Sequence, residues 1–288
     1  MTFELDKAKG MLLGLAIGDA LGTTLEFSRP HGNEKNHTEI TGGGPFHLPA
    51  GTFTDDTSMA LAIGASIIEQ KEFDALDIMQ EFWAWYSEGK YSPQNNCFDI
   101  GIATREALEH WSSNYEKPYA GSTDPQSSGN GNLMRMAPVI IYNHHRYECA
   151  LVDAVRQSLI THASNECVRH AQAMAAVLFR GSLEDSVHGI ELGKPYKMDD
   201  NGNPYCGGYI RETFTAACWA VRSTNSFEDA LIRIVNLGYD ADTTGAVTGQ
   251  IAGRIYGAEA IPSRWLDKLA WREKIEEMAE KLWEMAPN

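Results

Sequence analysis

The chain has 288 residues, of which 43% are hydrophobic and 22% are charged, and its formal net charge at pH 7 is −15. This hydrophobic fraction is enough for a sizeable core, whereas the acidic balance argues against a nucleic-acid or anionic-membrane surface, which would need clustered Lys and Arg. A phosphate-bearing ligand stays open, because bound cations and helix N-termini can neutralise a phosphate locally.

Helical periodicity runs through the whole chain. In the stretch 99–111, for example, Ala103, Ala107 and Trp111 recur at four-residue steps along one face. The predicted helices, in chain order, cover 5–21, 57–70, 74–87, 99–111, 148–161, 165–180, 208–222, 227–237, 243–256 and 272–285. No sustained period-2 alternation is bounded by turn signals, so strands should be few. The sequence predicts an all-α fold, a compact domain of many helices.

Three long segments interrupt these helices, at 28–53, 112–132 and 186–207. The first two are rich in Gly, Pro, Ser and Asn. Loops of this length inside a compact domain are usually functional or disordered. None of them looks like a clean linker, because helical patterns with apolar faces resume on both sides. We therefore expect one domain over residues 1–288.

The cysteines and the N-terminal stretch indicate a cellular location. The five cysteines include no C-x-x-C pair and their number is odd, so we expect free thiols in a reducing cytoplasm. The apolar run 11–17 (MLLGLAI) is too short to span a bilayer and follows acidic residues rather than a basic start. The sequence predicts neither a signal peptide nor a transmembrane segment.

Adjacent carboxylates precede the helix predicted at 57–70. Asp55 and Asp56 lie between Thr54 and Thr57 in the stretch FTDDTS. Such residues can simply cap a helix, because their side chains accept hydrogen bonds from free backbone N–H groups. One carboxylate is enough for a cap, however, and a second adds like-charge repulsion that asks for a compensating cation. Capping and metal binding both stay open for this stretch alone.

A second acidic stretch, GYDADTTG (238–245), precedes the helix predicted at 243–256. Asp240, Asp242 and Gly245 fit positions one, three and six of a calcium-binding EF-hand loop. That interpretation fails at position twelve, because Ile251 stands where a bidentate glutamate is needed. The stretch still offers a pair of carboxylates with neighbouring threonine hydroxyls at the start of a helix. Hard oxygen ligands of this kind suit Mg²⁺, Mn²⁺ or Ca²⁺ rather than zinc.

The two acidic stretches are more informative together than apart. If their helices converge, four aspartates and the neighbouring threonine hydroxyls surround one site. Four uncompensated carboxylates in a cleft would be very costly, so either cations bind or several carboxyls are protonated. Two metal ions ~3.5–4 Å apart would explain the number of ligands and could activate a water molecule.

The chain resembles a known family, the ADP-ribosylglycohydrolases, in order and over nearly its whole length. The two acidic stretches resemble the metal motifs of that family. Its other motifs are matched by 10–27 (GMLLGLAIGDALGTTLEF), 98–108 (FDIGIATREAL), 129–138 (GNGNLMRMAP), 161–162 (TH) and 207–220 (GGYIRETFTAACWA). Single motifs of this kind are weak, but seven in sequence make a specific match. The resemblance implies a hydrolase of ADP-ribosyl linkages, and the best-studied branch of the family removes ADP-ribose from arginine.

The resemblance also implies two divalent cations, Mg²⁺ or Mn²⁺. The implied metal ligands are Thr54, Asp55, Asp56, Asp240, Asp242 and Thr243. The family usually has a second glycine and a threonine where this chain has Tyr239 and Ala241. These departures leave every ligand oxygen in place, so they concern the pocket rather than the metals.

Further motifs map onto the substrate. The stretch GNGN consists of Gly129, Asn130, Gly131 and Asn132. It can be a turn before a helix, or it can let the backbone approach a diphosphate closely, and the resemblance favours ADP-ribose. His162 and Tyr209 are residue types that more often belong to a core when they stand alone. The resemblance implies a ligand or ribose contact for His162 and stacking on adenine or ribose for Tyr209.

Five acidic residues have expected roles, and two of them, Asp55 and Asp56, are also implied metal ligands. Asp99 would be an adequate N-cap, but in the arginine-directed branch the matching acid faces the guanidinium of the target, a natural partner for a carboxylate. Glu26 would contact the nicotinamide-side ribose or a water molecule. Asp55 or Asp56 is the expected general base. Asp19 is expected to be structural and to tie the first helix to its neighbours.

The sequence therefore predicts a dinuclear metal-dependent hydrolase that cleaves the N-glycosidic bond between ADP-ribose and an acceptor, with protein arginine preferred. The expected partners are an ADP-ribosylated protein and the product ADP-ribose, with no membrane or nucleic-acid partner. The alternatives are a non-catalytic ADP-ribose-binding or structural protein on the same scaffold, and a hydrolase of another ADP-ribosyl linkage, to serine, a nucleobase or a small molecule. A helical scaffold in which every acidic motif is only a cap also stays open.

Overall fold

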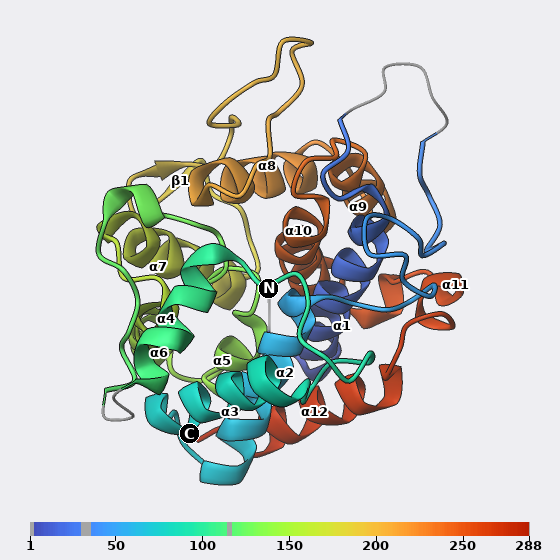
Figure 1. Cartoon of the computed structure of the whole chain (residues 1–288). Helices are drawn as coiled ribbons and strands as arrows, with labels where there is room; N and C mark the ends of the chain where they lie inside the picture. Colours follow the sequence, from blue (N-terminus) through green and yellow to red (C-terminus); the bar gives the residue numbers. More distant parts are fainter. Residues whose placement is uncertain (1–2, 30–35, 114–116, 288) are drawn as a thin grey trace.

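Helices make up nearly all of the regular structure in this computed structural model, which describes residues 3–29, 36–113 and 117–287 (Figure 1). Within those residues the α-helices are α1 (Leu5–Gly22), α2 (Asp55–Gln70), α3 (Ala75–Glu88), α4 (Ile102–Ser112), α5 (Ala137–Tyr142), α6 (Tyr147–Thr161), α7 (Asn165–Arg180), α8 (Ile210–Arg222), α9 (Phe227–Val235), α10 (Ala241–Tyr256), α11 (Ser263–Leu266) and α12 (Arg272–Glu284). Single-turn 3₁₀ helices are η1 (Thr23–Leu25), η2 (Pro125–Ser127) and η3 (Ala258–Ala260).

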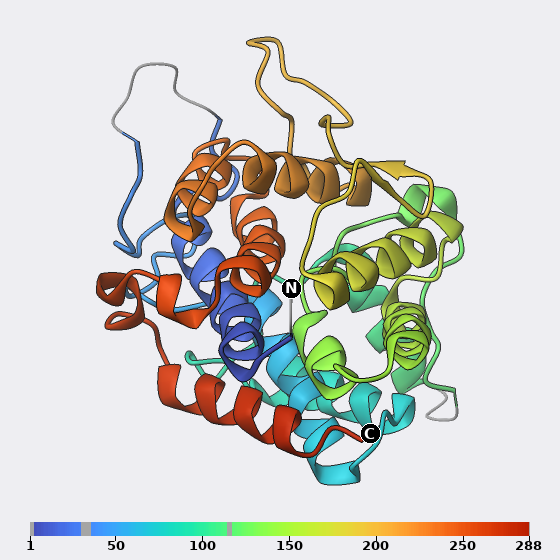
Figure 2. The same cartoon turned by 180° about the vertical axis from the view of Figure 1, so that it is seen from behind.

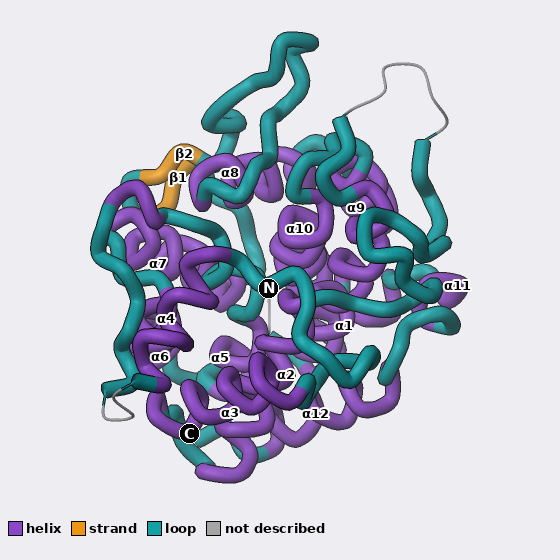
Figure 3. The backbone as a smooth tube through the Cα atoms, in the orientation of Figure 1, coloured by secondary structure: helices purple, strands orange, loops and turns teal. Residues whose placement is uncertain are grey.

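Strands are limited, in the described part of the chain, to one small antiparallel hairpin beside α7 (Figure 3). Its strands are β1 (Ser186–Val187) and β2 (Ile190–Glu191), with Ser186 opposite Glu191 and Val187 opposite Ile190. The hairpin opens the third long segment that interrupts the predicted helices. The prediction of an all-α fold with few strands is confirmed.

The ten predicted helices are all present, but several begin at other residues than expected. The helix that follows the first acidic stretch begins at Asp55, and the one in the second stretch begins at Ala241. Helix α4 begins at Ile102 instead of Asp99. The short helices α5 and α11 were not predicted. All six residues of α5 are buried, so its sequence carries no amphipathic stripe that would reveal it.

Helices α1 and α10 lie side by side through the centre of the molecule (Figures 1 and 2). Glycines recur at four-residue steps on both, and three on each helix face a glycine of the other helix. A Cβ atom on Gly14 would lie 2.2 Å from the Gly249 carbonyl oxygen, and one on Gly249 would lie 1.9 Å from the Gly14 oxygen. The same close approach joins Gly10 to Gly253 and Gly18 to Gly245. The helices therefore run antiparallel with their backbones in contact, and the C-terminal end of α1 lies beside the start of α10.

We expect Gly249→Ala to lower the free energy of unfolding by about 3 kcal/mol, the upper end of overpacking costs, because two backbones must move apart. This loss should appear even though alanine favours a helix by about 1 kcal/mol over glycine. Urea unfolding measures the change. Gly193→Ala is the matched control, since a Cβ there meets nothing within 4 Å, and we expect it to change stability by less than about 0.5 kcal/mol. Equal stability of the two variants would contradict the close packing.

Other features of the fold bear on the sequence predictions. All five cysteines are free, as expected, and Cys167, Cys206 and Cys218 are buried. Within the described ranges, no helix is both long and apolar enough to cross a membrane. Helix α12 packs across α1 and α2 on the side away from the start of α10, and its apolar stripe of Ile275 and Leu282 joins the core.

Candidate active site

A cleft of about 950 Å³ opens where α1 ends and α2, α4 and α10 begin. Its volume suits a ligand of cofactor size. The carboxylates in its lining are Glu26, Asp55, Asp99, Glu106 and Asp240. They come from four separate parts of the chain, so the fold gathers acidic groups that the sequence keeps far apart.

Asp19, on α1, holds the start of α2. Its Oδ1 accepts hydrogen bonds from the backbone N–H and the hydroxyl of Thr54, at 2.9 and 3.0 Å. Its Oδ2 accepts from the N–H and the hydroxyl of Thr57, at 3.0 and 2.6 Å. A carboxylate from another helix thus caps α2, and neither Asp55 nor Asp56 is needed for that purpose. The structural role expected of Asp19 is confirmed.

The two acidic stretches converge behind the cleft. The Thr54 hydroxyl lies 3.0 Å from Asp56 Oδ2 and 3.4 Å from Asp242 Oδ2. Carboxylate oxygens of Asp19, Asp56 and Asp242 lie within 4.8 Å of one another. Oxygens of Glu26, Asp240 and Asp242 form a second group of the same size, and Asp242 belongs to both. The two acidic stretches therefore meet in the structure, and Asp19 and Glu26 join Asp56, Asp240 and Asp242 in these groups.

These residues fit divalent cations. The Oδ1 atom of fully buried Asp56 and the Oε2 atom of Glu26 have no hydrogen-bond partner among the described residues. Buried polar atoms are nearly always paired, so orphaned carboxylate oxygens beside other carboxylates indicate a missing positive partner. Every donor in the cluster is a hard oxygen, which Mg²⁺, Mn²⁺ and Ca²⁺ prefer.

Burial and mutual repulsion disfavour the charged forms of these carboxyls. Burial, and then neighbouring carboxylates, raise the pKa values of Asp55, Asp56 and Asp242 well above the usual range. Burial raises the pKa of Glu26 to about 10, with Asp99 and Asp240 adding to the shift. The cluster therefore requires either protons or metal ions at neutral pH.

We expect the metal-free protein to lose stability as the pH rises from about 4 to about 7. Unfolded aspartates titrate near pH 3.9, whereas burial raises the pKa of Asp19 in the folded chain to about 6. Between these values the folded state binds more protons than the unfolded state, so unfolding becomes easier with rising pH. Thermal unfolding of EDTA-treated protein checks this. Mg²⁺ or Mn²⁺ should raise Tm more at pH 7.5 than at pH 5, and an equal rise at both values would contradict it.

Three non-glycine residues around the cleft have left-handed backbones, with φ of 57° at Phe27, 56° at Asp99 and 58° at Tyr239. The Phe27 N–H donates to the Tyr239 carbonyl at 2.6 Å, and the Tyr239 N–H donates to the Ser28 carbonyl at 2.7 Å. Strained backbones of this kind cluster at functional sites. The alternative of Asp99 as an N-cap is wrong, because Gly101 is the N-cap of α4 and Asp99 lines the cleft.

The GNGN stretch forms one wall of the cleft. Gly129, Asn130 and Gly131 line it, and the Asn130 side-chain amide donates to Asp240 Oδ2 at 2.6 Å. Asn132 is fully buried and absent from the lining, and its amide donates to the Ser158 hydroxyl at 2.8 Å. The stretch therefore both faces the cleft and anchors itself on α6.

Aromatic residues at the cleft differ from those expected. His162 lines it, whereas Tyr209 is absent from the lining and its ring meets Tyr196 edge-on at 5.8 Å. Tyr205 and Tyr239 do line the cleft, with ring centroids 4.5 Å apart. The sequence analysis assigned no substrate contact to either of these two tyrosines. The only signal was that Tyr239 departs from the glycine usual in the family.

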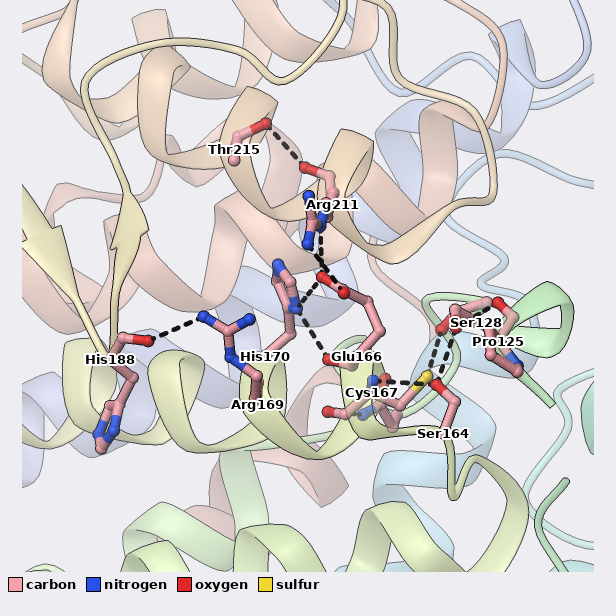
Figure 4. A network of polar contacts seen from close by, with 12 residues as sticks. Pro125, Ser128, Ser164, Glu166, Cys167, Arg169, His170, His188, Arg211 and Thr215 are labelled. Atoms are coloured by element: carbon pink, nitrogen blue, oxygen red, sulfur yellow. Dashed lines mark hydrogen bonds and ion pairs between the residues drawn. The ribbon is translucent and has the colours of Figure 1, made fainter. Parts of the chain in front are cut away.

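An ion-pair network joins α7 and α8 next to the GNGN stretch (Figure 4). Glu166 at the start of α7 pairs with both Nε and Nη2 of Arg211 on α8, the latter at 2.9 Å. His170 Nδ1 lies 3.2 Å from Glu166 Oε1. The backbone of Gly129 pairs with that of Tyr209, just before α8. Helices α7 and α8 are thereby locked together where the GNGN stretch meets the 207–209 segment.

The fold and the cleft together define an all-α protein with a buried cluster of oxygen ligands suited to divalent cations. Comparison with known proteins agrees with that class. The family model described as ADP-ribosylglycohydrolase matches residues 2–288. The chain therefore belongs to the ADP-ribosylglycohydrolase family, and the predicted membership is confirmed.

Relatives and solved structures support this assignment. The chain is 40% identical to the ADP-ribosylarginine hydrolase Tri1 of Pseudomonas putida (strain GB-1), over 99% of this chain and 80% of the relative. It is 33% identical to the ADP-ribosyl-[dinitrogen reductase] glycohydrolase of Rhodospirillum rubrum, over 92% and 90%. A solved ADP-ribosylglycohydrolase-related protein complex contains a chain that superposes with a TM-score of 0.84 at 35% identity, covering 98% of this chain and 99% of that one.

Proposed function

We propose that this protein hydrolyses the N-glycosidic bond between ADP-ribose and an arginine side chain of a modified protein and releases ADP-ribose. Its membership of the family and the activities for which relatives at 40% and 33% identity are named support this function. The observation that carries the proposal is the cluster of buried carboxylates at the cleft, in which Asp56 Oδ1 has no hydrogen-bond partner among the described residues. We further propose that residues 1–288 work as one domain, in the cytoplasm, where five free cysteines are stable.

We assign the cluster to two divalent cations, Mg²⁺ or Mn²⁺. The residues that would hold them are Thr54, Asp55, Asp56, Asp240, Asp242 and Thr243, and Glu26 lies close enough to join them. When bound, such ions compensate the carboxylates, orient ribose hydroxyls and make a water molecule more acidic.

The protein's own residues divide the reaction between them. Asp55 lines the cleft, whereas Asp56 lies fully buried behind it, so we assign Asp55 as the base that takes a proton from water. The water oxygen forms a bond to the anomeric carbon as the bond from that carbon to the guanidine nitrogen breaks. The bonding electron pair goes to that nitrogen, which then takes up a proton. Asp99 lies where it can hold the leaving guanidine through paired hydrogen bonds.

The remaining cleft residues would bind the rest of ADP-ribose. Gly129, Asn130, Gly131 and His162 form one continuous wall. We propose that this wall contacts the diphosphate and its neighbouring ribose, where backbone N–H groups suit phosphate oxygens. Asn132 would support the wall from behind. Tyr209, whose backbone pairs with that of Gly129, keeps its proposed role as a stacking partner, together with the cleft-lining Tyr205 and Tyr239.

Release of ADP-ribose from modified protein tests the proposal. The substrates are proteins or peptides modified on Arg, Ser or Asp/Glu, and ADP-ribosylated nucleobases, each incubated with Mg²⁺ or Mn²⁺ and with or without EDTA. We expect metal-dependent release from the arginine linkage in preference to the others. Well-folded protein that releases nothing but binds ADP-ribose would instead favour a binding protein, and preferential release from another linkage would reassign the acceptor.

A further inference from the structure

A buried arginine begins a chain of hydrogen bonds that ends in the cleft. Arg135 is fully buried, and its hydrogen bonds go to neutral groups rather than to a carboxylate. Its Nε donates to the side-chain oxygen of Gln157 at 3.0 Å, and its Nη2 donates to the Thr161 hydroxyl at 2.7 Å. The Phe82 ring covers the guanidinium, 4.6 Å from its carbon. A buried cation held in this way is costly, so its position needs a reason beyond packing.

The next link is the Thr161 hydroxyl, which lies 2.7 Å from Nδ1 of His162. Arginine can only donate hydrogen bonds, so the hydroxyl oxygen accepts from Arg135. The single hydroxyl proton is then free to donate, and the polar partner that the structure gives it is Nδ1. A proton on Nδ1 would leave the hydroxyl proton without that partner. The arrangement therefore favours the tautomer of His162 that carries its proton on Nε2.

The other edge of the imidazole meets the glycines of the cleft wall. A Cβ atom on Gly131 would lie 2.8 Å from His162 Cε1 and 3.2 Å from Nε2. A Cβ on Gly129 would lie 3.3 Å from Nε2. The two glycines thus leave room for the Nε2 edge of the histidine, and His162 lines the cleft together with them. Burial and the nearby guanidinium also lower the pKa of His162 to about 3, in agreement with a neutral ring.

We propose that Arg135 and Thr161 are positioning residues that fix His162 as a neutral Nε2–H donor to an oxygen atom of the bound substrate. The proposal rests on the proposed function only for the identity of that substrate, ADP-ribose attached to its acceptor. Neither Arg135 nor Thr161 lines the cleft, so both act through His162. The His162 ring that donates is uncharged, and the positive charge stays on Arg135, with Thr161 between the two side chains.

Nitrogen NMR of the full chain labelled with ¹⁵N-histidine reads the tautomer directly. The His162→Gln variant identifies the signals of this residue among the nine histidines. We expect an unprotonated Nδ1 and a protonated Nε2 in the unmodified protein. Thr161→Val removes the hydroxyl at nearly constant shape, so we expect the His162 pattern to move toward protonation of Nδ1, whereas Thr161→Ser should retain it. A protonated Nδ1 in the unmodified protein, or no change in Thr161→Val, would overturn the proposal.

Thr248→Val is the matched control for loss of a buried threonine hydroxyl. Thr248 is fully buried on α10, and its hydroxyl donates within its own helix to the Thr244 carbonyl at 2.7 Å. We expect this variant to leave the His162 nitrogen signals unchanged. If it alters them as much as Thr161→Val does, the effect is a general loosening of the fold and the relay is refuted.

Kinetics and binding give a second readout. We expect Thr161→Val to raise KM for ADP-ribosyl-arginine about tenfold with a much smaller change in kcat, the signature of a lost contact to bound substrate, while Thr161→Ser stays close to the unmodified protein. A change of less than about twofold in KM would count against the proposal. If no ADP-ribosyl linkage is cleaved at all, the proposed function fails, and the NMR pattern and a calorimetric titration with ADP-ribose still decide the relay.

Discussion

Asp56→Asn is expected to abolish most of the activity while making the metal-free protein more stable. The Asp56 Oδ1 atom has no partner in the described structure, and burial with neighbouring carboxylates raises the pKa of this residue. A neutral amide removes one charge from a crowded buried cluster, so unfolding of the metal-free chain should become harder at pH 7. It also removes a metal ligand. Since a bound metal supplies several kcal/mol of charge stabilisation, kcat/KM should fall by at least about 10³-fold.

Two measurements made together separate this expectation from simple helix capping. The first is Tm with EDTA and with saturating Mg²⁺ or Mn²⁺, and the second is the release of ADP-ribose. If Asp56 only capped α2, its replacement would cost roughly 1 kcal/mol of stability and leave activity intact. The matched control is Asp153→Asn, which removes a buried carboxylate that pairs with Arg156 outside the cleft. That variant should be less stable yet keep its metal-induced rise in Tm.

The sequence raised the convergence of the two acidic stretches only as a condition, although their charge indicated that each stretch needs a cation. Neighbouring carboxylates need a compensating partner, and Asp55 with Asp56 and Asp240 with Asp242 each lack an obvious cation nearby in the chain. The close packing of α1 on α10 helps to bring the stretches together, and it depends on glycines at four-residue steps in both helices. The glycine spacing alone does not show which two helices are in contact.

Other parts of the site depend on contacts between distant residues and leave no local pattern. The left-handed backbone of Asp99 turns a residue that looked like a helix cap into part of the cleft lining. Asp19 caps α2 from another helix, so the cap does not require the side chains of Thr54 or of the aspartates beside it. The glycines of GNGN were interpreted as space for a ligand, whereas at Gly129 and Gly131 the nearest side chain is the imidazole of His162.

Asp99→Asn is the variant that tests how the cleft recognises arginine. We expect kcat/KM for ADP-ribosyl-arginine to fall by about 10²-fold, because loss of one partner of a buried charge pair costs roughly 2–5 kcal/mol. The affinity for ADP-ribose, which lacks the guanidine, should change by less than about threefold, since the proposed contact is absent from that ligand. Steady-state kinetics and calorimetric titration give the two numbers. Glu106→Gln is the control, because Glu106 also lines the cleft from α4 but is exposed, where ion pairs contribute little.

The comparison of linkages makes this test specific to the guanidinium. A serine-linked ADP-ribose leaves as a neutral alcohol, so a carboxylate that serves mainly to hold a cation should matter much less for it. Asp99→Asn should therefore narrow the difference in kcat/KM between arginine-linked and serine-linked substrates. Equal losses on both linkages, with weaker ADP-ribose binding, would place Asp99 with Glu26 and Asp242 in the metal cluster, because these two carboxyls lie close enough to affect the pKa of Asp99. The ratio of kcat/KM for the arginine-linked substrate to that for the serine-linked substrate thus shows whether Asp99 recognises the acceptor or supports the metal ions.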